Sequence, residues 1–506
     1  MIDLTVAQIA AIVGGELADI SAEDAAALHV TGTVEFDSRK VTSGGLFLAL
    51  PGARTDGHDH AASAVAAGAA AVLAARPVGV PAIVVAPQAA DARTVDGGLA
   101  GVLEHDTDGS GAAVLAALAK LAAAVAAELV AGGLTIVGIT GSSGKTSTKD
   151  LLAAVLAPLG EVVAPPGSFN NELGHPWTVL RATAGTDYLI LELSARHPGN
   201  IAALAAIAPP AIGVVLNVGT AHLGEFGSRE AIARTKAELP QAVPRSGVVV
   251  LNVDDPAVAA MAEVTAARVV RISRHGHTAA DVWAGPVTLD ELARPRFTLH
   301  AGADSVVEVS LAVHGDHHVS NALCAAAVAL ECGATTEQVA TALAGAGAVS
   351  GHRMRVSTRA DGVTVIDDAY NANPDSMRAG LQALAWISSS SGAGRRRSWA
   401  VLGEMAELGE DAISEHDRIG RLAVRLDVSR LIVVGTGRSM GAMHHGAVME
   451  GSWGGEAAIV ADADAALAVL RAELQPGDVV LVKASNAAGL GALADSLAAD
   501  GRGDPR

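Results

Sequence analysis

The feature that most constrains the fold of this chain is a glycine-rich loop between an apolar run and a helical pattern. The apolar residues 134–137 are followed by Gly138-Ile-Thr-Gly-Ser-Ser-Gly-Lys-Thr-Ser147, and residues 148–157 have helical periodicity. A strand, a glycine-rich loop and a helix in this order aim backbone N–H groups and a helix N-terminus at an anion. Lys145 can then reach the outer phosphates of a nucleotide, and the Thr146 hydroxyl can bind Mg²⁺. The segment predicts a nucleoside triphosphate site whose loop residues are Gly141, Ser142, Ser143, Gly144, Lys145, Thr146 and Ser147.

The loop departs from the general nucleotide-binding template at one position. The template has a glycine five residues before Gly144, where this chain has Ile139. The remaining pattern, Gly141-x-x-Gly144-Lys-Thr, contains fewer glycines. An ordinary turn between a strand and a helix is therefore the alternative to a phosphate site.

Charge and cysteine content exclude several classes of protein. The 506 residues carry a net charge of −19, whereas a nucleic-acid binder needs a basic face. An anionic substrate must then be bound by local Lys, Arg and backbone donors rather than by the overall field. The two cysteines, Cys324 and Cys332, lie on an alanine-rich helical stretch, which indicates small core residues rather than a disulfide or a metal pair.

The apolar segments do not predict a membrane protein. The N-terminus lacks the basic region and long apolar core of a signal peptide. The apolar residues 112–131 are interrupted by Lys120 and Glu128, which favours an amphipathic helix over a membrane span. We expect a cytoplasmic protein, a monomer, with no membrane insertion and no nucleic-acid partner.

Recurring apolar runs predict three domains, over residues 1–110, 111–348 and 349–506, on a prior of about 150 residues per domain. A polar, glycine-rich stretch at 106–111 is typical of a linker. Continuous apolar runs that alternate with helical sequence indicate parallel sheets covered on both faces, so we expect an α/β fold. The predicted strands of the second and third blocks are 188–193, 212–217, 248–252, 363–366, 399–402, 430–434 and 478–482.

Polar residues at the carboxyl ends of such strands are candidates for chemistry, because parallel α/β sheets bind ligands there. Glu192 ends an apolar strand, where a carboxylate is costly unless it is paired with a cation or a metal. Mg²⁺ binding is one interpretation, and a salt-bridged carboxylate is the other. His222 follows the next strand, as either a functional or a structural histidine. Lys236 is by local sequence a solvated helix lysine.

These residues, together with further motifs, resemble the Mur ligases of peptidoglycan synthesis over nearly the whole chain. The segment with two aspartates before Tyr370 is typical of the branch that adds D-alanyl-D-alanine, whereas the phosphate loop marks only the superfamily. The motifs are Phe36-Asp-Ser-Arg-Lys40, Ser168-Phe-Asn-Asn-Glu-Leu-Gly-His-Pro176, Ala221-His-Leu-Gly-Glu-Phe-Gly-Ser228, His314-Gly-Asp-His-His-Val-Ser-Asn-Ala322 and Ile366-Asp-Asp-Ala-Tyr-Asn-Ala-Asn-Pro-Asp-Ser-Met377.

The resemblance implies a three-domain ligase. The first domain would hold the UDP end of UDP-N-acetylmuramoyl-tripeptide, and the central phosphate-loop domain, built on a parallel sheet, would hold ATP and Mg²⁺. A Rossmann-like α/β domain at the C-terminus would hold the incoming amine. ATP would phosphorylate the terminal carboxylate of the tripeptide, and the amine of D-alanyl-D-alanine would attack the acyl phosphate to give a pentapeptide.

The resemblance also implies roles for individual residues. Lys145, Glu192, His222 and Lys236 would be catalytic, and Lys236 would be carbamylated so that it carries a carboxylate toward a second Mg²⁺. Thr146, Glu192, His222 and the carbamate of Lys236 would bind metal. The ATP contacts would include Asn321, Arg353 and Asp368, the uridine contacts Ser38 and Arg39, the muramoyl-peptide contacts Asn170 and Asn171, and the dipeptide contacts Asn371 and Asn373.

Several positions depart from the family pattern. His352 stands before Arg353 where a glycine is expected, and Lys483-Ala-Ser-Asn486 replaces Lys-Gly-Ser-Arg. The segment 89–111 is an insertion longer than the family core requires. The histidines and aspartate within residues 314–318 also suggest a zinc site, as an alternative to the family's His-x-x-Asn loop.

Two other functions are the rivals of this hypothesis. One is a sibling ligase that adds a single amino acid, including the folylpolyglutamate synthetases. The other is an ATP-gated scaffold that has lost catalysis. The presence of Lys145, Thr146, Glu192, His222 and Lys236 together argues against the scaffold.

Overall fold

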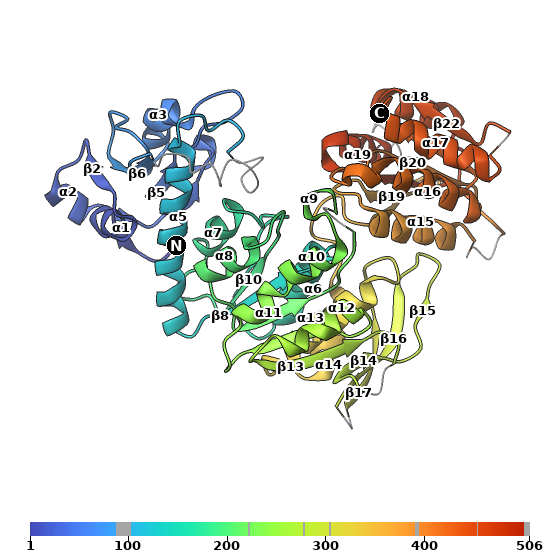
Figure 1. The fold of residues 1–506 in the computed structure, drawn as a ribbon, viewed down its shortest axis with the longest axis horizontal. Coiled ribbons are helices and arrows are strands. Elements are labelled where there is room, and N and C mark those ends of the chain that lie inside the picture. The colour runs from blue at the N-terminus through green and yellow to red at the C-terminus, as the bar shows by residue number, and fades with distance from the viewer. Residues whose placement is uncertain are drawn as a thin grey trace.

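Three large β-sheets along the chain organise the protein. The computed structural model describes residues 1–87, 103–220, 223–276, 279–302, 305–389, 394–452 and 454–499. Figure 1 shows an N-terminal part in blue, a central part from cyan to yellow and a C-terminal part in orange and red, each with its own sheet. The three-domain α/β architecture expected from the sequence is thereby confirmed.

The N-terminal sheet has five strands in the order β2-β7-β6-β5-β4, of which β4 to β7 are parallel and β2 is antiparallel to β7. A separate pair, β1 and β3, lies beside it. The strands are β1 (Leu4–Thr5), β2 (Glu16–Ala18), β3 (His29–Val30), β4 (Val34–Glu35), β5 (Gly45–Leu48), β6 (Ala69–Ala74) and β7 (Ala82–Val84), and the helices are α1 (Val6–Val13), α2 (Ala22–Ala27) and α3 (Ala61–Ala66).

The long helix α5 (Ser110–Ala131) joins the N-terminal and central parts. By length and composition alone it is apolar enough to cross a membrane, and it is the one such helix among the described residues. It packs against α1 and β6 on one side and against α7 and α8 of the central part on the other. Leu118, Leu121 and Val125 of this helix are fully buried there. The apolar face predicted at 112–131 is therefore covered by protein.

The central sheet has ten strands in the order β15-β16-β14-β13-β12-β11-β8-β10-β9, with β17 paired to β16. The strands predicted at 188–193, 212–217 and 248–252 are confirmed as β10, β11 and β12, and they are parallel to β8, which precedes the phosphate loop. The strands are β8 (Thr135–Thr140), β9 (Val162–Val163), β10 (Tyr188–Glu192), β11 (Ile212–Val215), β12 (Val248–Asn252), β13 (Arg268–Ser273), β14 (Val282–Ala284), β15 (Thr288–Leu289), β16 (Pro295–Ala301) and β17 (Ser305–Ser310).

An antiparallel extension differs from the all-parallel sheet expected here. Strand β16 pairs antiparallel with β14, β15 and β17. Buried Phe297 and Leu299 alternate along it with the more exposed Arg296 and Thr298. This alternation belongs to a strand with one face in the core, whereas the continuous apolar runs of β8 and β10 to β12 belong to strands covered on both faces.

Helices cover both faces of the parallel part of the central sheet. Helix α6 packs with α13 and α14 on one face, while α8 and α11 pack on the other. The helices are α6 (Lys145–Leu156), α7 (Gly174–Val179), α8 (Asn200–Ile207), α9 (Leu223–Phe226), α10 (Arg229–Lys236), α11 (Glu238–Ala242), α12 (Pro256–Ala259), α13 (His318–Glu331) and α14 (Thr336–Gly345).

The C-terminal sheet has six strands in the order β18-β19-β23-β20-β21-β22, parallel except for β18. Helices α15 to α17 cover one face, and α18 and α19 cover the other. The four strands predicted in this block are confirmed. The elements are β18 (Arg355–Thr358), β19 (Thr364–Asp368), α15 (Pro374–Ser389), β20 (Ser398–Leu402), α16 (Ala412–Arg425), β21 (Arg430–Val434), α17 (Arg438–Glu450), β22 (Ala457–Val460), α18 (Ala463–Glu473), β23 (Val479–Lys483) and α19 (Leu490–Ala499).

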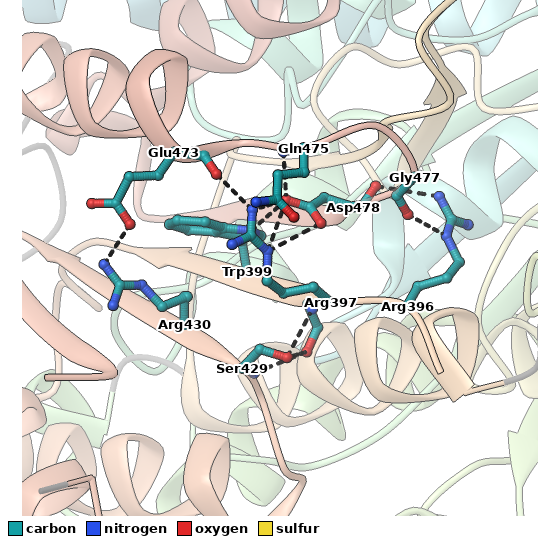
Figure 2. Close-up of polar contacts among 10 residues, drawn as sticks. Arg396, Arg397, Trp399, Ser429, Arg430, Glu473, Gln475, Gly477 and Asp478 are labelled. Atoms are coloured by element: carbon teal, nitrogen blue, oxygen red, sulfur yellow. Dashed lines mark hydrogen bonds and ion pairs between the residues drawn. The ribbon is translucent and has the colours of Figure 1, made fainter. Parts of the chain in front are cut away.

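A polar network stabilises this sheet at the amino ends of its strands, as Figure 2 shows. The fully buried Trp399 donates its indole N–H to the Asp478 carboxylate at 2.9 Å. The Arg397 guanidinium donates to the same carboxylate at 2.7 Å and lies 5.0 Å from the Trp399 ring centre. Asp478 thus satisfies an indole and a guanidinium at once, at the edge opposite the carboxyl ends of the strands.

Candidate active site

The phosphate loop has the strand–loop–helix geometry that the sequence predicts. Strand β8 ends at Thr140, and α6 begins at Lys145. Gly144 has φ of +85°, a left-handed conformation that favours glycine. A Cβ at this position would lie 2.8 Å from the Asn321 Oδ1 atom. The predicted nucleotide contact Asn321, on α13, therefore lies directly against the loop.

Asn217, for which the sequence predicts no role, holds the loop in place. The Ser143 amide donates to the Asn217 side-chain oxygen at 3.0 Å, and the Ser142 amide donates to the Asn217 carbonyl at 3.1 Å. The Ser142 hydroxyl in turn accepts the Gly219 amide at 2.9 Å. The only sequence signal for Asn217 was its position as a polar residue at the end of an apolar run.

Lys145 places its amine against the loop backbone. Its amine donates to the Gly141 carbonyl at 2.7 Å. Burial lowers the pKa of the Lys145 amine, the positive Arg353 lowers it further, and the negative charge of Glu192 opposes the shift. The amine therefore lies in a dry environment at the helix N-terminus, where its interaction with an anion is strong.

Glu192 and Thr146 form a set of oxygen atoms suited to a hard cation. Glu192 is 1% exposed, and its Oε2 atom accepts the Thr146 hydroxyl at 3.2 Å and the Asn170 amide at 3.4 Å. The Oε1 atom is buried and has no partner in the described part of the chain. Burial raises the pKa of Glu192. A carboxylate with an unsatisfied oxygen beside a hydroxyl fits Mg²⁺, which prefers oxygen ligands.

Lys236 is buried rather than solvated, so the default interpretation from local sequence is wrong. The residue is 7% exposed at the end of α10, and its amine makes no hydrogen bond or ion pair with any residue that the structure describes. Burial lowers the pKa of the amine well below its ordinary value, and the nearby positive charge of Lys145 adds to this. His222, the other predicted residue of this edge, lies outside the described residues.

Arg353 reaches this edge of the central sheet from the segment that leads into the C-terminal domain. Its guanidinium donates to the Ser168 hydroxyl at 3.0 Å and to the Thr146 hydroxyl at 3.5 Å. It also lies 4.1 Å from the centre of the Tyr370 ring. The predicted contact of Arg353 with the nucleotide is therefore consistent with its position, although a histidine precedes it.

Asp368 and Lys483 form a buried ion pair in the wall of the site. The Lys483 amine lies 2.5 Å from the Asp368 carboxylate and donates to the Asn371 carbonyl at 3.0 Å. Burial lowers the pKa of Lys483, against the effect of Asp368. The altered Lys483-to-Asn486 segment is thus part of the site, because Asn486 also faces the cleft.

One cleft of about 610 Å³ brings most of the predicted residues together. The predicted residues that line it are Ser142, Ser143, Gly144, Lys145, Thr146, Ser147, Asn170, Asn171, Glu192, Asn321, Arg353, Asp368, Asn371 and Asn373. Among the predicted residues that the structure describes, Gly141, Lys236, Ser38 and Arg39 do not line it. Ser38 and Arg39 lie on a short 3-10 helix of the N-terminal part, where the exposed Arg39 pairs with Asp37 at 2.8 Å.

The histidines at 314–318 favour the family loop over the zinc alternative. His314 bonds the Leu292 carbonyl at 2.8 Å, and Asp316 pairs with Arg274 at 2.7 Å. The Asn321 amide lies 3.3 Å from the His318 ring nitrogen, as a His-x-x-Asn pair on one helix turn. Most of the long segment at 89–111 lies outside the described residues.

Three family models match the chain in the order of its domains. The "Mur ligase family, catalytic domain" matches residues 31–123, the "Mur ligase middle domain" residues 139–329, and the "Mur ligase, glutamate ligase domain" residues 352–486. The chain belongs to the Mur ligase family, as the motifs around the phosphate loop and Tyr370 predict.

Within the family, the chain is similar to UDP-N-acetylmuramoyl-tripeptide–D-alanyl-D-alanine ligases. It is 80% identical to the ligase of Mycobacterium tuberculosis over 511 residues, covering 99% of this chain and 98% of the relative. It is 34% identical to that of Escherichia coli over 437 residues, or 86% of each chain.

Solved structures agree with this placement. A crystal structure of MurF from Acinetobacter baumannii superposes with a TM-score of 0.79 at 27% identity, covering 98% of this chain and 99% of the other. The MurF ligase from Thermotoga maritima in complex with ADP gives a TM-score of 0.73 at 27% identity, covering 94% and 98%.

Proposed function

We propose that this protein is an ATP-dependent ligase that joins D-alanyl-D-alanine to UDP-N-acetylmuramoyl-tripeptide, giving the pentapeptide precursor of peptidoglycan. The observation that carries the proposal is the cleft, where a phosphate loop faces Tyr370 and Asn373 of the motif typical of D-alanyl-D-alanine addition. The name and the 80% identity of a full-length relative support the same reaction.

The reaction needs an activated carboxylate, because a carboxylate oxygen is a poor leaving group. Transfer of the γ-phosphoryl group of ATP to the tripeptide carboxylate gives an acyl phosphate and ADP. The amine of D-alanyl-D-alanine then attacks the acyl carbon, the carbon–oxygen bond to phosphate breaks, and the amine loses a proton. The products are an amide, inorganic phosphate and ADP.

The residues of the cleft would supply the positive charge that brings two anions together. Lys145 and Arg353 converge near Thr146 from two different domains, and both can bind phosphoryl oxygens. Thr146 and Glu192 would hold Mg²⁺, which when bound neutralises charge that develops on the transferring phosphoryl group. The buried Oε1 atom of Glu192, which has no hydrogen-bond partner among the described residues, supports this assignment.

Lys236 is proposed to carry a carbamate. Its dry surroundings favour the neutral amine, and only a neutral amine has the lone pair that attacks carbon dioxide. The new nitrogen–carbon bond releases one proton and leaves a negative charge beside Lys145. Such an anion suits a metal site, where an ammonium would repel Mg²⁺. His222 is proposed as a further metal ligand on the family resemblance alone.

The remaining roles follow the family resemblance. Ser38 and Arg39 would contact the uridine nucleotide, Asn170 and Asn171 the muramoyl-peptide, and Asn371 and Asn373 the dipeptide. Asn321 and Asp368 would contact ATP. The domains 1–110, 111–348 and 349–506 would bind the UDP end, ATP with Mg²⁺, and the amine. A cytoplasmic monomer is part of the same proposal.

The direct test is to incubate the protein with ATP, Mg²⁺, UDP-N-acetylmuramoyl-tripeptide and D-alanyl-D-alanine, and to weigh the product. We expect a mass gain of one dipeptide less one water. D-alanine alone should be a poor substrate, because a site built for the dipeptide leaves polar groups unpaired with the smaller ligand. Equal rates with D-alanine would indicate a sibling ligase, and phosphate release independent of any amine would contradict ligation.

A Lys145→Ala variant tests whether the phosphate loop takes part in phosphoryl transfer. It removes one charge aimed at the transferring phosphoryl group, and such a loss typically costs about 10²–10³ in turnover. The fold should survive, since the hydrogen bond of the Lys145 amine is to the Gly141 carbonyl of its own loop. Near-normal turnover in this variant would remove the phosphate loop from the mechanism.

A further inference from the structure

Arg353 reaches the phosphate loop through a strained stretch of backbone. His352 and Met354, the residues on either side of it, have φ of +56° and +47°. Neither is glycine, and non-glycine residues rarely adopt this left-handed region unless the surrounding structure holds them there. Something in the fold must therefore fix both flanks of Arg353.

Two consecutive carboxylates of β19 fix these flanks. The Nδ1 atom of His352 lies 3.0 and 2.9 Å from the two carboxylate oxygens of Asp367, which is 2% exposed. The Met354 amide donates to Asp368 at 3.1 Å. The Tyr370 amide donates to the His352 carbonyl at 3.2 Å, and its ring lies against the Arg353 guanidinium.

Helix α19 leaves space for the imidazole. A Cβ at Gly491 would lie 3.1 Å from the His352 ring, so the ring rests against bare backbone there. The other ring nitrogen faces Asp495 at 3.7 Å, and Asp495 also faces Arg355 at 3.7 Å. The imidazole is thus held between β19 and α19 and turned away from the cleft.

The upstream end of the same segment is anchored to the helix of the phosphate loop. The Ser350 amide and hydroxyl donate to the Asp150 carboxylate at 3.0 and 3.1 Å. The buried Lys149 amine lies 2.8 Å from the same carboxylate and donates to the Ser350 hydroxyl at 3.1 Å. Helix α6 therefore holds Ser350 at one end while β19 holds His352 and Met354 at the other.

We propose that His352, with Asp367, is a positioning residue that fixes the backbone of Arg353 so that its guanidinium points at the phosphate loop. Glycine would adopt the same backbone more easily, but it would leave the segment free to move. With histidine the backbone at this position is strained, but the imidazole forms an ion pair or hydrogen bond with the buried carboxylate of Asp367. The inference rests on the proposed role of Arg353 at the nucleotide.

A double-mutant cycle tests it. His352→Ala should weaken ADP binding and lower kcat/KM for ATP by roughly tenfold, because misplacement of a positioned group by about 1 Å can cost up to 10²-fold. In an Arg353→Ala background the same change should have no further effect, since residues that act through one another are not additive. His352→Gly, which suits the left-handed backbone, should fold normally and show the same loss of ADP binding and kcat/KM as His352→Ala. Asp367→Asn should show this loss as well.

The outcomes separate this inference from the proposed function. An equal loss in both backgrounds, or no loss beside an intact Arg353, would overturn the role of His352. Calorimetric measurement of ADP affinity, without the other substrates, gives the coupling between His352 and Arg353 even if the protein does not catalyse ligation. His29→Ala is the matched control, because His29 lies on β3 of the N-terminal part, does not line the cleft and forms an exposed pair with Asp3 at 2.6 Å, and it should change neither readout.

Discussion

Three lysine amines in and beside the cleft share one unusual property. Burial lowers the pKa of Lys145, Lys236 and Lys483, and each has a different environment. Lys483 is paired with Asp368, and Lys145 donates to its own loop, while the nearby positive charge of Lys145 adds to the effect of burial on Lys236. The three buried lysines therefore differ in what lies beside the amine: a carboxylate for Lys483, a loop carbonyl for Lys145 and a like charge for Lys236.

Lys236 gives the sharpest prediction at this scale. Lys236→Arg keeps a positive charge but cannot be carbamylated, so we expect a nearly inactive enzyme with an unchanged fold. Lys236→Ala should be equally impaired, and acetate should restore part of its activity by filling the vacated anion position. Ligation rates measured with and without acetate test this. Most of the activity surviving in Lys236→Arg would refute the carbamate.

His175 predicts a pH dependence of stability. Burial lowers its pKa from 6.5 to about 4, so the folded protein keeps the ring neutral while the unfolded chain binds a proton below about pH 6.5. The unfolded state binds more protons in this range, so stability falls as the pH drops from 6.5 toward 4. This residue should contribute a loss of about 1–2 kcal/mol at pH 5.

Urea unfolding from pH 7 to pH 5 measures this effect. His175→Phe should flatten the pH dependence, although His317 has a pKa lowered to about 4 by burial and will contribute its own part. An identical pH slope in the variant and the wild type would show that His175 is protonated in the folded protein.

At the scale of elements, apolar runs identified the strands that build the parallel sheets. Val, Ile and Leu runs gave β8, β10, β11 and β12 and their counterparts in the C-terminal domain, because strands buried on both faces need continuous apolar sequence. The antiparallel β16 was missed, since its apolar residues alternate with polar ones. Continuous apolar runs therefore identified the strands buried on both faces and missed a strand with one exposed face.

Contacts between distant segments were much less predictable. The family motifs identified Arg353, but its contact with Ser168 joins residues 185 positions apart. The pairing of His352 with Asp367 and of Ser350 with Asp150 was likewise invisible, because no local pattern encodes which carboxylate a linker residue will meet. Motifs predicted which residues line the cleft, and the fold alone showed what holds them.

The network around Trp399 predicts the stability of the C-terminal sheet. Asp478→Ala removes the acceptor of a buried indole N–H and of Arg397, and we expect a loss of roughly 2–4 kcal/mol in the unfolding free energy. Glu473→Ala is the control: its pair with Arg430 is partly exposed and should contribute less than about 1 kcal/mol. Comparable losses in urea unfolding would argue against a special role for Asp478.

At the scale of the whole molecule, the cleft depends on contacts between two domains. Arg196 and Glu407 form an ion pair at 3.0 Å across them, and the Trp386 indole N–H donates to the Asp290 carbonyl at 2.8 Å. Backbone meets backbone at Gly224 and Gly409, where a Cβ on Gly224 would lie 2.6 Å from the Gly409 nitrogen. Figure 1 shows α9, which contains Gly224, on the side of the central part that faces the C-terminal sheet.

Gly224→Ala should therefore push the two domains apart. We expect a larger radius of gyration in small-angle X-ray scattering and a lower kcat, since Arg353 and Tyr370 would move away from the phosphate loop. Gly441→Ala, in helix α17 with nothing within 4 Å of the added Cβ, is the matched control and should change neither. A Gly224→Ala protein with wild-type scattering and turnover would show that the contact adapts to a methyl group.

The segment that delivers Arg353 also bears on how this chain can evolve. Upstream of Ser350, Gly345 and Gly347 have open space around them and Val349 is 81% exposed, so an inserted residue can bulge into solvent. Between Ser350 and Met354 both ends are held by hydrogen bonds, to Asp150 and Asp368. One extra residue would add about 3.3–3.6 Å of chain that this fixed span cannot accommodate. Insertions and deletions should accumulate before position 350 and be rare in the four residues after it, so that the length of this segment is constrained as well as the side chains of His352 and Arg353.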